Sequence, residues 1–163
     1  MLFKPSLPCF VLCLFMISCS TTPDEIPENT ELEKQLVGEW RNSSLKLIMN
    51  SFSNKDSTKI FEVKEGDWER KMKIQPIRTF YRGDGTYNSE HRTLRDSIIY
   101  NPAGRWAILG DTIIMRDTFP EPGLSYRYKI VIKGDVAEFT GMEDCDRDGK
   151  ADDNYSGTQR RQK

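Results

Sequence analysis

The chain contains 163 residues, and its 24 lysine and arginine residues against 25 aspartate and glutamate residues give a formal net charge of -1. This balance excludes a protein that follows a phosphate backbone, because such binding needs an excess of basic side chains, so no nucleic acid partner is expected. Charged residues make up 30% of the chain and aromatic residues 10%, which is too polar for an integral membrane protein and too aromatic for a wholly disordered one. The length suits one domain with a modest core.

Residues 1–18 are typical of a secretory signal peptide. Lys4 supplies a positive charge, an apolar run from Phe10 to Ile17 follows, and small residues end the segment. The apolar run is far shorter than the roughly 18–20 residues that span a bilayer. We therefore expect an exported protein.

The end of this segment, Met16-Ile17-Ser18-Cys19, resembles the lipobox of bacterial lipoproteins, although Met16 stands where leucine is usual. The resemblance implies cleavage before Cys19 and a covalent lipid on its thiol and on the new amino group. Several acyl chains hold a protein firmly on a membrane. The implied location is the outer membrane, on its periplasmic face or at the cell surface. An ordinary cleaved signal peptide is the alternative.

Residues 19–34 read as the lipidated cysteine and a flexible acidic tether. Ser20 to Lys34 contains two prolines and five acidic residues, and its only apolar side chains are Ile26 and Leu32. Such a segment lacks the apolar surface to fold alone. Once the signal peptide is removed and Cys19 is lipidated, Cys145 is the remaining cysteine, so no disulfide is expected within the chain.

Residues 35–163 are predicted to form one all-β domain. Alternating polarity between glycine-containing turns indicates strands at 38–42, 44–51, 58–64, 71–82, 85–91, 98–101, 104–109, 112–117, 125–133, 136–141 and 154–161. A row of short strands leaves exposed edges unless it closes on itself. We therefore expect a single antiparallel up-and-down β-barrel, with a β-sandwich as the alternative.

Gly38-Glu39-Trp40 in the first predicted strand resembles the G-x-W signature of the lipocalin (calycin) group. In that group an arginine near the C-terminus packs across the tryptophan, a place that Arg160 or Arg161 could take here. The ordered set Asp84-Gly-Thr-Tyr87, Gly104-Arg-Trp106 and Gly110-Asp-Thr-Ile-Ile-Met115 resembles the lipocalin-like lipoproteins of Bacteroidetes. The resemblance implies a small apolar or amphipathic ligand in the barrel mouth. The candidate lining residues are Phe80, Tyr87, Trp106, Tyr126 and Tyr128.

An acidic hairpin loop at 143–153 carries the pattern D-x-D-x-D-G-x-x-D, which resembles the first nine positions of an EF-hand loop. Calcium takes six to eight oxygen ligands on a curled loop of this kind. The predicted ligands are the side chains of Asp144, Asp146, Asp148 and Asp152 and the carbonyl of Lys150. Tyr155 stands where the EF-hand has a bidentate glutamate, so a weak structural calcium site between two strands is expected. A solvated loop without metal is the alternative.

No catalytic motif is present, and the lone His91 cannot build a histidine-rich metal site, so we expect no enzyme. Two functions remain. The first is a lipid-anchored envelope protein that carries a small ligand in a lipocalin-like barrel. The second is an interaction module of the envelope, an inhibitor or a scaffold, with a solid barrel that contacts a partner protein.

Overall fold

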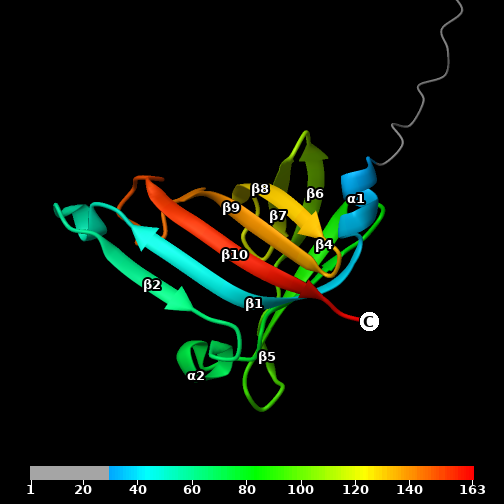
Figure 1. Cartoon of the computed structure of the whole chain (residues 1–163), viewed down its shortest axis with the longest axis horizontal. Helices are drawn as coiled ribbons and strands as arrows, with labels where there is room; N and C mark the ends of the chain where they lie inside the picture. The colour runs from blue at the N-terminus through cyan, green and yellow to red at the C-terminus, as the bar shows by residue number, and fades with distance from the viewer. Residues whose placement is uncertain (1–29) are drawn as a thin grey trace, which may run out of the picture.

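The computed structural model describes residues 30–163, which form one antiparallel sheet of ten strands (Figure 1). The predicted signal peptide, Cys19 and residues 20–29 of the predicted tether lie outside the described residues. The strands are β1 (Gly38–Met49), β2 (Lys59–Val63), β3 (Arg78–Tyr81), β4 (Thr86–Arg92), β5 (Ile98–Tyr100), β6 (Ala103–Leu109), β7 (Thr112–Phe119), β8 (Ser125–Lys133), β9 (Val136–Glu143) and β10 (Asp153–Arg161).

Eight of these strands form a closed ring in the order β1, β3, β4, β6, β7, β8, β9 and β10, and the pairing of β10 with β1 closes it. Each ring strand pairs with the next ring strand along the chain, which is an up-and-down topology. The predicted all-β barrel is therefore confirmed, and the sandwich alternative is wrong because the ring leaves no second layer. Closure satisfies the backbone groups that an open edge would expose.

Alternation and tight turns explain why these segments form a barrel. In β6, Gly104, Trp106 and Ile108 are buried and the residues between them are exposed, as expected for a strand with one face inward. Gly110 after β6 and Gly134 after β8 have φ values of +65° and +60°, which side chains rarely adopt. These glycines permit the short hairpins β6–β7 and β8–β9.

The two strands predicted at 38–42 and 44–51 are one long strand, β1, with a register shift between Asn42 and Ser44. One edge of β1 pairs with β10, and its other edge pairs first with β3 and then with β2. A bulge lets a strand bend without ending, so an interruption of the alternating pattern need not mark a turn.

Residues 31–34, predicted as part of the tether, belong instead to helix α1 (Glu31–Leu36). Thr30 and Glu33 form a capping box, in which Glu33 N–H donates to Thr30 Oγ1 at 3.2 Å and Thr30 N–H donates to Glu33 Oε2 at 2.6 Å. The buried Leu36 then anchors the helix to the barrel core. The T-x-x-E spacing is a sequence signal for a helix start, and the acidic composition of the segment concealed it.

The strand predicted at 71–82 is also corrected. Residues Trp68–Met72 form the short helix α2, which holds Trp68 in a buried position and ends at Lys73 with φ of +59°. The ladder of β3 begins only at Arg78, after Pro76. Proline has no N–H to donate to a sheet, so it limits how far the strand extends toward α2.

One end of the barrel is filled by apolar side chains, and we call it the solid end. Its buried residues are Leu36, Trp40, Trp106, Ile108, Ile113, Ile130 and Ala137. Helix α1 packs there against β6 and β8 (Figure 1). Trp40 is fully buried, and its indole N–H donates to the carbonyl oxygen of Leu36 at 2.7 Å. Among residues 30–163, no helix is long and apolar enough to cross a membrane.

Arg161, rather than Arg160, takes the position across the tryptophan. Its guanidinium carbon lies 4.5 Å from the centre of the Trp40 ring, and its Nη1 donates to the carbonyl oxygen of Val37 at 2.8 Å. A Cβ on Gly38 would lie 2.8 Å from that same nitrogen, so the glycine leaves room for the arginine. Arg160 points to the outer surface, where it pairs with Glu65. The G-x-W motif and the C-terminal arginine are thus parts of one contact.

Candidate functional site

The opposite end of the barrel, which we call the hollow end, contains a cavity of about 240 Å³. All six tyrosines of the chain line it. The lining residues are Asn42, Ile77, Thr79, Tyr81, Tyr87, Ser89, His91, Tyr100, Pro102, Met115, Asp117, Tyr126, Tyr128, Phe139, Tyr155 and Gln159. The sequence therefore concentrates its phenol groups on one internal surface.

The same strands supply both ends of the barrel through their inward-facing positions. On β7, Ile113 belongs to the solid end, whereas Asp117 faces the cavity four residues later. On β8, Ile130 belongs to the solid end, whereas Tyr126 and Tyr128 face the cavity. Because side chains alternate along a strand, every second residue faces inward, and its distance along the strand decides which end it reaches.

The tyrosine rings form a packed wall. Tyr128 lies with its ring centre 4.7 Å from that of Tyr155, and Tyr126 stacks on Tyr128 at 6.4 Å. Burial raises the pKa of Tyr126 and of Tyr155 to about 12. Burial also raises the pKa of Tyr81, Tyr87 and Tyr128 above the ordinary range. These hydroxyls therefore stay protonated at neutral pH and can donate or accept hydrogen bonds.

Asp117 brings a carboxylate to the cavity wall. Its residue is only 2% exposed, and the Tyr87 hydroxyl donates to its Oδ1. Its backbone N–H donates to the Leu124 carbonyl oxygen at 2.9 Å, which fixes the start of the β7–β8 connection. Among residues 30–163 no ion pair includes Asp117. Carboxylates are rarely buried in proteins unless a basic group pairs with them, and the partner of Asp117 is a neutral hydroxyl.

Two further titratable groups adjoin the cavity. His91 packs edge-on against Tyr100 with ring centres 5.1 Å apart, and burial lowers its pKa, so the imidazole is held neutral. Glu143 accepts a hydrogen bond from the Tyr128 hydroxyl, and burial raises the pKa of its carboxyl group. The cavity wall is therefore polar at several points despite its aromatic surface.

Of the five lining residues predicted from the sequence, the structure places Tyr87, Tyr126 and Tyr128 on the cavity wall. Phe80 does not line the cavity, and the Arg78 guanidinium carbon lies 5.2 Å from its ring centre. Trp106 lies at the solid end and meets the Tyr81 ring edge-on at 5.7 Å. Phe80 alternates with Thr79 and Tyr81, so a register error of one residue exchanges the two faces.

The predictions missed Tyr81, Tyr100, Tyr155, Asp117 and His91 as cavity residues. Tyr81 and Tyr155 could have been found from the alternation of their strands. Tyr100 and His91 belong to the short β4–β5 pairing, whose position against the barrel depends on long-range contacts.

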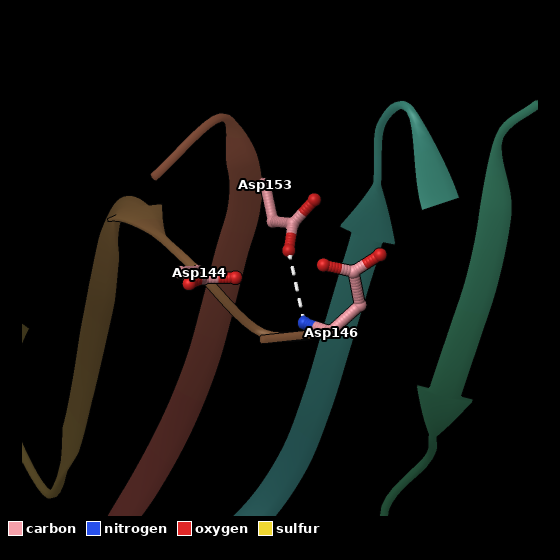
Figure 2. Close-up of side chains that lie close together, drawn as sticks. All are labelled: Asp144, Asp146 and Asp153. Atoms are coloured by element: carbon pink, nitrogen blue, oxygen red, sulfur yellow. Dashed lines mark hydrogen bonds between the residues drawn. The ribbon is translucent and has the colours of Figure 1, made fainter. Parts of the chain in front are cut away.

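The acidic loop brings together two of its predicted ligands and one residue that was not predicted. Oxygen atoms of Asp144, Asp146 and Asp153 all lie within 4.8 Å of one another. Figure 2 shows these three side chains gathered beside the start of β10. Asp153 begins β10 and is fully buried. Its Oδ2 accepts from the backbone N–H groups of Cys145 at 2.7 Å and Asp146 at 3.3 Å, and its Oδ1 accepts from that of Asn50 at 2.8 Å. Asp153 thus joins the loop to the β1–β2 connection.

The other predicted ligands lie outside this group of three carboxylates. Asp148 accepts from the Asn54 N–H at 3.3 Å, and Asp152 accepts from the Ser51 hydroxyl at 3.0 Å. Lys150 donates its backbone N–H to Asp148 Oδ1 at 3.0 Å. Oδ1 of Asp152 is buried without a hydrogen-bond partner. The flanking segments β9 and β10 are strands, as predicted, and not the helices of an EF-hand.

Cys145 lies within the acidic loop with an unoxidised thiol. Burial, followed by the carboxylates of Asp153 and Glu143, raises its pKa to about 11. A thiol with so high a pKa carries little thiolate at neutral pH and reacts slowly. This environment agrees with a structural cysteine rather than a nucleophile.

No protein-family model matches the chain, and no curated protein matches it either. The functional interpretation therefore depends on the closed barrel, on the cavity and on the chemistry of the residues that line it.

Proposed function

We propose that the protein is a lipid-anchored member of a bacterial cell envelope that binds a small amphipathic ligand inside a lipocalin-like barrel. The export and anchoring part of this proposal is supported by the lipobox-like sequence that ends at Cys19. The lipocalin-like part is supported by the closed barrel and by the contact between Trp40 and Arg161.

The observation that carries the binding proposal is the cavity of about 240 Å³ lined by all six tyrosines. A chain of this length could fill its barrel with aliphatic and indole side chains, as it does at the solid end. Tyrosines instead give the hollow end both apolar ring faces and hydroxyl groups. Such a wall suits a ligand with an apolar body and a few polar atoms.

The size of the cavity limits the ligand. Sites for drug-sized molecules measure about 300–1,000 Å³, so a cavity of about 240 Å³ suits a smaller one. A compact molecule with one ring fits this space better than a long acyl chain does.

The binding proposal is tested by filling the cavity. Ser89 is buried and lines the cavity, so Ser89→Phe would occupy its space. Ser156 is exposed on β10, and Ser156→Phe is the matched control. Native mass spectrometry of domains purified from bacteria should detect a bound small molecule on the wild type and on Ser156→Phe, and none on Ser89→Phe. No bound mass on the wild type, or equal retention by all three proteins, would contradict the proposal.

We also propose that the acidic loop binds Ca²⁺ as a weak structural site. The three clustered carboxylates repel one another, and the buried Oδ1 of Asp152 lacks a partner, so a cation would stabilise the loop. Extracellular calcium modules bind with dissociation constants of about 10⁻⁴–10⁻³ M, and we expect this loop, which lacks the bidentate glutamate, to bind in that range. A concentration ten times the dissociation constant would add about 1.4 kcal/mol to the free energy of unfolding.

Thermal unfolding in millimolar Ca²⁺ and in chelator tests this site. The midpoint should rise with Ca²⁺ in the wild type, and Asp144→Asn should abolish the rise. Asp84→Asn removes the same charge from the β3–β4 turn and should leave the rise intact. Equal midpoints with Ca²⁺ and chelator in the wild type would refute the calcium proposal.

The interaction module is the second candidate, and exposed apolar residues on one hairpin favour it. Leu94, Ile98 and Ile99 around the β4–β5 turn are 53%, 49% and 59% exposed. A partner protein could cover them. Size-exclusion chromatography of the envelope fraction, compared with a Leu94→Ser/Ile99→Ser variant, would detect a partner that depends on this hairpin.

A further inference from the structure

The charges around the hollow end are unequal. Asp117 lines the cavity, whereas no lysine or arginine appears among its lining residues. His91 is the basic residue among those that line the cavity, and burial lowers its pKa, so its imidazole is neutral at neutral pH. Within the part of the chain that the structure describes, the wall therefore carries a negative group without a basic counter-group.

Two more carboxyl groups, of Glu121 and Glu143, lie close enough to raise the pKa of tyrosines on the wall. Burial raises the pKa of the Tyr100 hydroxyl, and the nearby carboxylates of Glu121 and Asp117 raise it further. Glu143 contributes in the same direction at Tyr126 and accepts the hydrogen bond of Tyr128. Clefts lined by one sign of charge concentrate ligands of the opposite sign.

Burial of the Asp117 carboxylate is energetically unfavourable while no cation pairs with it. Asp117 is 2% exposed, and its carboxylate accepts a hydrogen bond from the neutral Tyr87 hydroxyl. Removing a carboxylate from water is unfavourable unless an opposite charge and hydrogen bonds compensate. A cationic ligand in the cavity would supply that charge.

The tyrosine rings add a second attraction for a cation. Aromatic ring faces carry negative potential, and several rings around one site form a cage that binds ammonium groups. Tyr128 packs against Tyr126 and Tyr155 on the cavity wall, and the ring centres of Tyr81 and Tyr87, also on the wall, lie 6.4 Å apart. These rings can cover the apolar part of a ligand and the carbon atoms next to its charge.

We propose that the cavity selects a small organic cation, a protonated or quaternary amine with a compact apolar group, whose nitrogen lies against Asp117 and whose apolar part packs on the tyrosine rings. This inference rests on the proposed ligand-binding function and specifies the chemical class of the ligand. It also excludes fatty acids and phosphate esters, since their negative groups would meet Asp117 with no basic residue on the wall to pair with them.

Isothermal titration calorimetry with three matched probes tests the inference on the intact mature domain. The probes are phenethylammonium, the neutral 2-phenylethanol and the anionic 3-phenylpropanoate, which share one aromatic ring and a short arm. We expect the cation to bind about tenfold more tightly than the alcohol, because a hydrogen bond between charged groups is stronger than one that involves a neutral hydroxyl. The anion should show no measurable binding.

Asp117→Asn should reduce the affinity for phenethylammonium by about tenfold and leave that for 2-phenylethanol almost unchanged. The asparagine oxygen can still accept from Tyr87, so the local structure has a replacement partner. Asp111→Asn is the matched control, because Asp111 lies at the exposed β6–β7 turn and pairs there with Lys129. This control should bind all three probes as the wild type does.

The outcomes separate the inference from the proposed function. Equal affinity for the cation and the alcohol, with no effect of Asp117→Asn, would overturn the charge selectivity and leave a ligand-binding cavity. Failure of all three probes would also overturn the inference, and the Ser89→Phe comparison would then decide whether the cavity holds another ligand. If Asp117→Asn does not fold, the ranking of the three probes on the wild type still decides.

Discussion

The two ends of this barrel are built by the same strands and differ in what those strands place inside. At the solid end, Trp40, Ile113 and Ile130 fill the interior and α1 covers them. At the hollow end, tyrosines and Asp117 surround a cavity. The closed hydrogen-bonded ring therefore sets the fold at both ends, while the inward side chains fill the interior at one end and leave a cavity at the other.

This division predicts that changes at the solid end act chiefly on stability. Trp40→Ala should lower the free energy of unfolding by about 3–5 kcal/mol, because the fully buried indole leaves a large cavity and loses its bond to Leu36. Urea unfolding followed by circular dichroism measures the change. Tyr100→Ala, at the hollow end, is the comparison, and an equal loss there would contradict the assignment of stability to the solid end.

The contact across Trp40 gives the next largest effect. Arg161→Ala should cost about 1–3 kcal/mol, because it removes the contact with the Trp40 ring and the bonds to Val37 and Gln35. Arg160→Ala should change the stability little, since Arg160 pairs with Glu65 on the exposed surface. Equal midpoints of urea unfolding for the two variants would refute a specific role for Arg161.

The smallest effect concerns His91 at the hollow end. Burial lowers its pKa below the ordinary 6.5, so the unfolded chain takes up a proton more readily than the folded one as the pH falls below 6.5. The free energy of unfolding should therefore decrease toward acidic pH through this group and recover as the pH rises. His91→Asn should lose less stability than the wild type between pH 7.5 and pH 5.5, which thermal unfolding measures. A steeper acid loss in the variant would contradict the burial of a neutral imidazole.

Much of the fold follows from local patterns in the sequence. β8 coincides with the predicted segment 125–133, and β10 begins within one residue of the predicted 154. Alternation and glycine turns determine such hairpins locally. The bulge in β1 could not be predicted in this way, because the pairing of β1 with three partners is determined by the assembled sheet.

Less of the candidate site than of the fold could be predicted from the sequence. Tyr126 and Tyr128 were identified because their strand has a clear period of two, while Phe80 was chosen from the wrong face of its strand. Asp117 shares the inward face of β7 with Ile113 and Met115, but it was not predicted because a charged side chain is rarely buried. Asp153 was missed because the loop was compared with EF-hand spacing, whereas its role comes from contacts with Asn50 across the sheet.

The most direct test of the two-ended barrel is an NMR titration of protein labelled with ¹³C only in tyrosine and tryptophan rings. All six tyrosines line the cavity, so every tyrosine signal reports on the hollow end, while Trp40 and Trp106 report on the solid end. Addition of phenethylammonium or 2-phenylethanol should shift the tyrosine signals and leave those of Trp40 and Trp106 in place. Shifts of the tryptophan signals with unchanged tyrosine signals would contradict binding at the hollow end.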